Sequence, residues 1–412
     1  MKRILSFLLI VLLACTATAA LTSCSEMETI VLNVYNWGEY ISDGSEDTLD
    51  VNAAFEAYYL ETYGVKLEVN YTTYASNEDL YAKLKSGATG YDIIIPSDYM
   101  IQRMISEDML ETLNFNNIPN YQYISESCRG LFYDPQEKYS VPYTYGMIGV
   151  IYNAARVDEA DVGGWDLLWN PKYSGQILQF NNSRDAFGSA MYYAGIDPNT
   201  TDMTEWQKAL DLLVTQKVLV QSYVMDEVFN KMEGEEAAIA AYYAGDYLSM
   251  AENNENLAFY YPTDEEGNYV TNAFIDAMCI PKGCKNKEAA ERYIDFMLSK
   301  EVAIANAEYV YYASPNRLVY EDADYIDYIG EEGMEILYPS HMNFKEMYST
   351  YAYRNLSTEM LQEVNVLWEK LKIDSSTVGN GIYIACAVIL VFLIAYAIFS
   401  YVQKLRHRRY YW

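Results

Sequence analysis

Aromatic and acidic side chains recur at the ends of apolar, strand-like runs along this chain. They are Trp37 and Tyr40, Ser97 and Tyr99, Asn182 and Asp185, Tyr243 and Asp246, Phe274 and Asp276, and Tyr312. Aromatic faces can hold methylene groups and attract ammonium ions. Carboxylates can accept charge-assisted hydrogen bonds from ammonium groups. The pattern predicts a cleft for a small cation with an apolar stem.

Asp276 is the most informative of these acids, because it lies inside the apolar run AFIDAMCI. A carboxylate buried among apolar residues is costly unless it is paired or hydrogen-bonded. Asp185 follows Arg184 and can be a helix cap or half of a solvated ion pair. Asp246 can be an ordinary turn residue after Ala-Gly, and Tyr312 taken alone fits a core position. The cation site therefore depends on whether the fold brings these residues together.

The stretch YDIIIPSDYM, residues 91–100, indicates how strands can position such side chains. Residues 93–95 form an uninterrupted isoleucine run, typical of a strand buried on both faces of a parallel sheet. Pro96 ends that strand, because proline has no N–H to donate to a neighbouring strand. Residues 97–99 then follow the strand's carboxyl end, which is where ligands bind in open α/β sheets. Taken alone, the stretch also fits a core strand with a polar turn.

The order of the elements predicts an α/β fold. The strand-like runs of the first part are 30–37, 65–71 and 91–95, with helical patterns at 51–63 and 77–87. Short links between alternating strands and helices favour a parallel sheet. An extended crossing segment, 139–153, leads to a second α/β set between residues 176 and 281. One long helix is expected over 286–309, and the chain to Lys372 is expected to be helical and irregular.

Both ends of the chain carry apolar segments. Residues 1–24 are typical of an export signal with a basic start and an apolar core, and Leu-Thr-Ser-Cys at 21–24 resembles a bacterial lipobox. That resemblance implies lipidation of Cys24, with ordinary signal cleavage as the alternative. Residues 382–402 are uncharged and long enough to span a bilayer, and the basic tail 403–412 follows them. The sequence thus predicts a membrane-tethered body on the extracytoplasmic face.

Composition narrows the chemistry. The net charge of −30 repels nucleic acid and attracts cations. Only two histidines, His341 and His407, and no glycine-rich phosphate loop are present, so zinc, a histidine relay and nucleotide cofactors are poorly supported. We therefore expect no cofactor, no bound metal and no enzyme activity. Cys128, Cys279 and Cys284 are too few for a disulfide framework, although the last two can pair.

Several stretches together resemble one family. They are YNWGEYIS, YASNEDLYAKLKSGATGYDIIIPSDYM, KYSVPYTYGMIGVIYN, WDLLWNPKYSGQI, AAYYAGDY, AFIDAMCIPKGCKNKEAAERYIDFML and YASPN. In this order, over about residues 30–370, they resemble the spermidine/putrescine-binding proteins of polyamine ABC importers. The resemblance implies a two-lobed periplasmic-binding-protein fold of type II with two crossover strands. The expected lobes are 27–145 with 265–312, and 146–264 with 313–373.

The resemblance also implies roles for individual residues. Trp37, Tyr40 and Tyr99 would stack on a methylene chain, and Ser97 would offer a hydrogen bond. The ammonium groups would lie at Asp185, Asp246 and Asp276, between walls made by Tyr243, Phe274 and Tyr312. The family often has Trp at positions 243 and 274 and a hydroxyl-bearing residue at 38, where this chain has Tyr, Phe and Gly. Asn182 stands where spermidine binders can carry Asp, and Tyr-Ala-Gly-Asp at 243–246 resembles the putrescine-preferring members. The resemblance therefore favours putrescine, with spermidine open.

The expected partners are a small polyamine and the permease subunits of an ABC transporter, with the receptor itself a monomer. Three other readings remain open from the sequence. The tyrosine pairs at 242–243 and 311–312 can suit ferric ion, because phenolates and carboxylates bind hard cations. A membrane-tethered polyamine sensor would need the same cleft. A glycosidase would need two of the carboxylates at a fixed separation, which nothing in the sequence sets.

Overall fold

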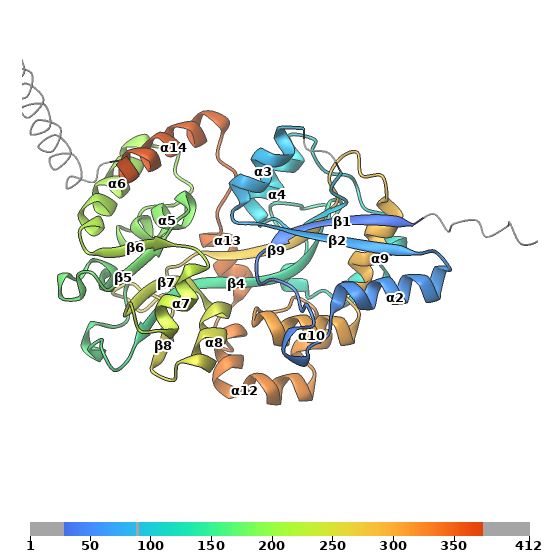
Figure 1. Cartoon of the computed structure of the whole chain (residues 1–412). Coiled ribbons are helices and arrows are strands. Elements are labelled where there is room, and N and C mark those ends of the chain that lie inside the picture. Colours follow the sequence, from blue (N-terminus) through green and yellow to red (C-terminus); the bar gives the residue numbers. More distant parts are fainter. Residues whose placement is uncertain (1–28, 88–89, 374–412) are drawn as a thin grey trace, which may run out of the picture.

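The computed structural model describes residues 29–87 and 90–373, in which strands and helices form two lobes with β4 and β9 running between them (Figure 1). The strands follow the order β2-β1-β3-β9-β4-β7-β5-β6 across one continuous sheet, and β8 also pairs with β4. They are β1 (Ile30–Trp37), β2 (Leu67–Tyr74), β3 (Ile93–Ile94), β4 (Ser140–Asn153), β5 (Ile177–Phe180), β6 (Val220–Val224), β7 (Ile239–Tyr243), β8 (Leu257–Tyr260) and β9 (Ala273–Cys279).

Helices cover the sheet of each lobe (Figure 1). In the first part of the chain they are α2 (Val51–Tyr63), α3 (Asn77–Lys85) and α4 (Asp98–Ser106). The middle part holds α5 (Ser183–Tyr193), α6 (Met203–Lys217), α7 (Glu227–Glu233) and α8 (Ala244–Asn253). The last part holds α9 (Lys287–Met297), α10 (Lys300–Val310), α11 (Arg317–Tyr320), α12 (Ala323–Leu337), α13 (Phe344–Tyr351) and α14 (Thr358–Ile373).

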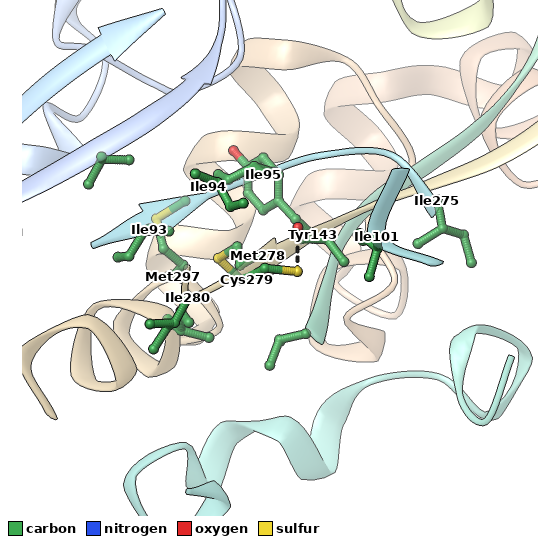
Figure 2. Close-up of a cluster of buried hydrophobic side chains, with 14 of the residues drawn as sticks. Ile93, Ile94, Ile95, Ile101, Tyr143, Ile275, Met278, Cys279, Ile280 and Met297 are labelled. Atoms are coloured by element: carbon green, nitrogen blue, oxygen red, sulfur yellow. Dashed lines mark hydrogen bonds between the residues drawn. The ribbon is translucent and has the colours of Figure 1, made fainter. Parts of the chain in front are cut away.

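The first lobe has the parallel β-α-β-α-β start that the sequence predicts. Strand β1 pairs in parallel with both β2 and β3, and helices α2 and α3 connect them. Ile93, Ile94 and Ile95 are all at most 1% exposed. Figure 2 shows them packed with side chains from β9 and α9, including Met278 and Met297. This burial holds the end of β3, and hence the following residues 97–99, in a fixed place.

Strand β4 belongs to both lobes. Its residues 140–147 pair with β9, whereas residues 148–153 pair with β7 and β8. The buried side chains divide at the same point, since Met147 packs in the core of the first lobe and Ile148 in the core of the second. The chain leaves the first lobe along β4 and returns to it along β9. In the second lobe β5 pairs in parallel with β6 and β7.

The C-terminal helices divide between the two cores. Tyr348 of α13 packs in the core of the first lobe, whereas Trp368 of α14 packs in that of the second. A small third cluster, which includes Ala307 and Tyr325, joins α10 to α12. The predicted lobe boundaries remain a prediction.

The predicted helix over 286–309 is wrong as a single element. It is two helices, α9 and α10, because Ser299 between them has an extended backbone with φ −63° and ψ 147°. The Ser299 hydroxyl donates to the Phe296 carbonyl oxygen at 2.7 Å, and its own carbonyl oxygen accepts the first bond of α10, from Ala303 N. Serine is common at the residue before a helix, although the Ser299 side chain makes no capping hydrogen bond to α10. The apolar periodicity alone does not reveal this break.

One further prediction needs correction, and the structure also decides between the two states that the sequence left open for Cys279 and Cys284. The predicted fold class included a C-terminal transmembrane helix, but within residues 29–87 and 90–373 no helix is long and apolar enough to cross a membrane. The predicted segments 1–24, with Cys24, and 382–412 lie outside the described residues. Cys279 and Cys284 do not pair: both are free thiols, as is Cys128, and Cys284 Sγ donates instead to Asp92 Oδ1 at 3.1 Å.

Candidate functional site

A cavity of about 110 Å³ lies in the cleft between the two lobes, and the structure brings all ten predicted site residues to its wall. They are Trp37, Tyr40, Ser97, Tyr99, Asp185, Tyr243, Asp246, Phe274, Asp276 and Tyr312. Asn182 lines it as well. Most of them come from the carboxyl ends of β1, β3, β5 and β7 and from β9, whereas Tyr312 follows α10. Their role in ligand binding stays a prediction, but their convergence removes the alternative that each is an isolated turn or core residue.

Asp276 lies within β9 and is only 5% exposed. Its Oδ2 accepts a hydrogen bond of 2.7 Å from the Tyr40 hydroxyl, which also lies within hydrogen-bond distance of Thr144 Oγ1. Its Oδ1 is buried and has no hydrogen-bond partner among the described residues. Burial raises the pKa of Asp276 to about 6. A buried acceptor without a partner is costly, so this oxygen is suited to a cationic donor that enters the cavity.

Asp185 lies in the first turn of α5. Asn182 caps this helix by accepting from Asp185 N, and its amide donates to Asp185 Oδ2 at 2.8 Å. The Tyr243 hydroxyl donates to the same oxygen at 2.6 Å. Burial raises the pKa of Asp185. The neighbouring Arg184 is 4% exposed, and its guanidinium lies 4.5 Å from the centre of the Tyr353 ring. Asp185 and Arg184 therefore do not form the solvated ion pair that the sequence left open.

Asp246 lies in the first turn of α8, directly after β7. Its Oδ2 accepts a hydrogen bond of 3.0 Å from the Tyr312 hydroxyl. Burial, together with a smaller contribution from the nearby Asp226, raises the pKa of this carboxyl to about 8. Tyr312 is 7% exposed, so it is both a core residue and a wall of the cavity.

Aromatic rings form a continuous wall around these acids. The ring of Tyr312 lies 5.1 Å from that of Tyr40 and 6.2 Å from that of Phe274, and Phe274 lies 5.5 Å from Tyr243. All three pairs meet edge to face, which leaves ring faces free to contact a ligand. On the β1 side, Trp37 is fixed by a hydrogen bond of 2.8 Å from its indole N–H to the Ile95 carbonyl oxygen.

Ser97 and Tyr99 are held by residues of α3. The Ser97 amide donates to Asn77 Oδ1 at 3.1 Å, and the Asn77 amide donates to Ser97 Oγ at 3.0 Å. The Tyr99 hydroxyl donates to Glu78 Oε1 at 3.1 Å, and burial raises the pKa of Glu78. Asp98 between them accepts from the backbone N–H groups of Tyr99 and Ile275, and burial raises its pKa to about 7.

The ionisable residues that line the cavity are acidic. Among the described residues its lining includes no Lys, Arg or His, but seven carboxyl groups: Glu39, Glu78, Asp98, Asp185, Asp226, Asp246 and Asp276. The sequence predicts three of these carboxyl groups as site residues: Asp185, Asp246 and Asp276. Glu78 and Asp98 lie within the quoted motifs, where they also fit helix N-termini, so only their burial distinguishes them. Tyr353 and Asp226 come from distant segments that no local pattern connects to the cleft.

The ferric alternative does not fit the tyrosines. The hydroxyls of Tyr243 and Tyr312 each donate to a separate carboxylate, and Tyr311 lies apart, 2.9 Å from the Tyr328 hydroxyl. Within the described part of the chain, no group of three His, Cys, Asp or Glu side chains is arranged to hold a metal ion. The cavity instead offers acceptors and ring faces to an organic cation.

Two lobes joined by crossing strands, with a ligand-sized cavity between them, define a solute-binding protein. The chain belongs to the bacterial extracellular solute-binding protein family, whose sequence pattern matches residues 53–330. This is a family of transport receptors rather than of enzymes.

The chain is also similar to individual solute-binding proteins. The chain is 32% identical over 287 residues to the spermidine/putrescine-binding periplasmic protein of Escherichia coli, covering 69% of this chain and 77% of that one. It is 28% identical over 323 residues to a putrescine-binding periplasmic protein of the same organism, covering 74% and 82%. The solved spermidine/putrescine ABC transporter substrate-binding protein of Streptococcus pneumoniae superposes with a TM-score of 0.64 at 31% identity, covering 84% and 99%.

Proposed function

We propose that this protein is an extracytoplasmic receptor that binds a polyamine such as putrescine or spermidine and delivers it to an ABC transporter permease. The observation that carries the proposal is the buried Asp276, which lines a cavity of acids and aromatic rings and whose Oδ1 has no partner among the described residues. The names of the similar proteins support the same ligand class.

The geometry supports binding of the two ammonium groups and the methylene chain by different residues. One ammonium group would donate to Asp276 Oδ1, which has no other partner among the described residues. A second would lie at Asp246 or Asp185, which line the same cavity. The methylene chain would pass over the rings of Tyr40, Phe274 and Tyr312, where apolar contact and cation–π attraction act together.

A panel of ligands in thermal denaturation tests this proposal. A ligand that binds only the folded state raises the midpoint of unfolding in proportion to the logarithm of its concentration. Putrescine, spermidine and spermine should raise the midpoint, whereas a neutral amino acid and ferric citrate should leave it unchanged. A rise with ferric citrate alone would overturn the polyamine assignment.

Binding should weaken as the pH falls. Burial raises the pKa of Asp276 to about 6 and that of Asp246 to about 8, and a carboxyl that carries its proton no longer attracts an ammonium group. The dissociation constant for putrescine should therefore increase as the pH is lowered from 8 to 5, by at least about tenfold for each carboxyl that must give up its proton. Titration calorimetry across this range measures it, and a constant affinity would contradict the roles of both acids.

The proposed site of action is the outer face of the cytoplasmic membrane, with the receptor held there by lipid on Cys24. The lipobox-like Leu-Thr-Ser-Cys at 21–24 and the family of extracellular proteins support this placement. We expect Cys24→Ala to release the protein from the membrane fraction and to remove a diacylglycerol mass from its N-terminal peptide. An unmodified Cys24 in the mass spectrum of the wild-type protein would contradict lipid anchoring.

A further inference from the structure

Asp226 of the second lobe lies against Gly38 of the first, at the edge of the cleft. Asp226 immediately precedes α7, and Gly38 immediately follows β1. A β-carbon built on Gly38 would lie 3.3 Å from Asp226 Oδ2, which is tighter than ordinary van der Waals contact. A side chain at position 38 would require this carboxylate to shift by a few tenths of an ångström, so glycine favours its close approach to the opposite lobe.

No described residue forms a hydrogen bond or a salt bridge with the Asp226 carboxylate. Asp226 holds the N-cap position of α7, yet its side chain makes no capping hydrogen bond. Within residues 29–87 and 90–373 it accepts no other side-chain hydrogen bond and forms no salt bridge, although it lines the cavity. Its neighbour Glu227 does have such a role, since Glu227 Oε2 accepts a hydrogen bond of 3.0 Å from Met225 N.

Asp226 shares its part of the cavity with Asp246. The two carboxyl groups are close enough for the charge of Asp226 to raise the pKa of Asp246. Asp246 Oδ2 is occupied by the Tyr312 hydroxyl, and no described Lys or Arg lies among the lining residues to offset the pair. Two carboxylates that repel each other are stabilised by a cation that both can contact. The unpartnered, buried Asp276 Oδ1 in the same cavity independently indicates a cationic ligand.

We propose that Asp226 is a ligand-binding residue, which shares one ammonium group of the polyamine with Asp246 at the solvent-facing end of the cavity. Because the same carboxylate rests on Gly38, this contact also holds the two lobes together at the mouth while the amine is bound. The inference rests on the proposed polyamine function and adds a residue from α7 to the site.

A double-mutant cycle measured by titration calorimetry with putrescine tests the inference on the full-length protein. Asp226→Asn should raise the dissociation constant about tenfold, the factor expected for a partly exposed charge-assisted hydrogen bond. Gly38→Ala displaces the carboxylate and should raise it as well. Because both changes disturb one contact, the double variant should bind about as weakly as Asp226→Asn alone. Glu227→Gln, which removes the same charge one residue further on and keeps the acceptor for Met225 N, is the matched control and should bind like the wild type.

The outcomes separate this inference from the proposed function. Wild-type protein that binds no polyamine would refute the proposed function. Wild-type binding together with wild-type affinity in Asp226→Asn would refute the role of Asp226 alone, and so would single effects that multiply in the double variant. The unliganded Asp226→Asn protein should unfold at the wild-type midpoint, because this side chain has no described partner. A marked drop would make Asp226 a structural residue and would also refute the inference.

Discussion

Asp276→Asn should raise the dissociation constant for putrescine by at least about 100-fold, the largest effect of any single substitution in the site. The reason is that Asp276 is 5% exposed and offers a cation a buried oxygen with no other described partner. An asparagine has nearly the same shape but no charge, so an ammonium group would be desolvated without compensation. Titration calorimetry measures the change.

The same substitution should not destabilise the empty protein. Burial raises the pKa of Asp276 from 3.8 to about 6, so ionisation in the folded state costs stability as the pH rises through 6. At pH 8 that cost is at most about 3 kcal/mol, and Asn removes it. The unliganded variant should therefore unfold at or above the wild-type midpoint, while the stabilisation by putrescine disappears. Asp108→Asn, which changes an exposed carboxylate of the same lobe, is the control and should bind normally. A tightly binding Asp276→Asn protein would contradict the account of the site.

Asp246→Asn should produce the second largest effect, a rise in the dissociation constant of about 30-fold. The effect is smaller because burial raises the pKa of Asp246 to about 8, so at pH 7 the empty site must first lose a proton before the carboxylate can bind an ammonium group. That proton should appear in solution when the ligand binds. Calorimetry in buffers with different heats of ionisation counts it.

The number of protons released on binding distinguishes a direct role of Asp246 from an indirect one. Wild-type protein should release close to one more proton at pH 7 than Asp246→Asn does when putrescine binds. Glu252→Gln on the same helix α8 is the control, because Glu252 is exposed and does not line the cavity. Equal proton release by wild type and Asp246→Asn would mean that Asp246 does not contact the ligand.

The parts of the fold that the sequence predicts well are those whose signals are local. The isoleucines at 93–95 indicate a strand buried on both faces, and the alternation around them predicts the parallel start of the first lobe. Strand β8 was missed because its LAFY run is short. The break at Ser299 was missed because apolar spacing continues across it from α9 to α10.

The sequence indicates the environment of some site residues but not of others. The carboxylate of Asp276 within AFIDAMCI required a partner, and the structure supplies Tyr40 for one of its oxygens. The sequence could not decide whether Asp185 is a helix cap, half of an ion pair or a site residue. Its environment depends on the hydrogen bond from Tyr243, which is 58 residues away. Asp226 gave no signal at all, because its importance depends on Gly38, which lies across the cleft. Contacts between lobes are set by how the domains close, and no local pattern encodes that.

Titration calorimetry of the ligand-stripped, full-length protein with putrescine, spermidine, spermine and a neutral amino acid measures polyamine binding itself. We predict that at least one polyamine binds tightly with one molecule per chain, and that the neutral amino acid gives no heat. Folded, stripped protein that gives no heat with any polyamine would contradict the account.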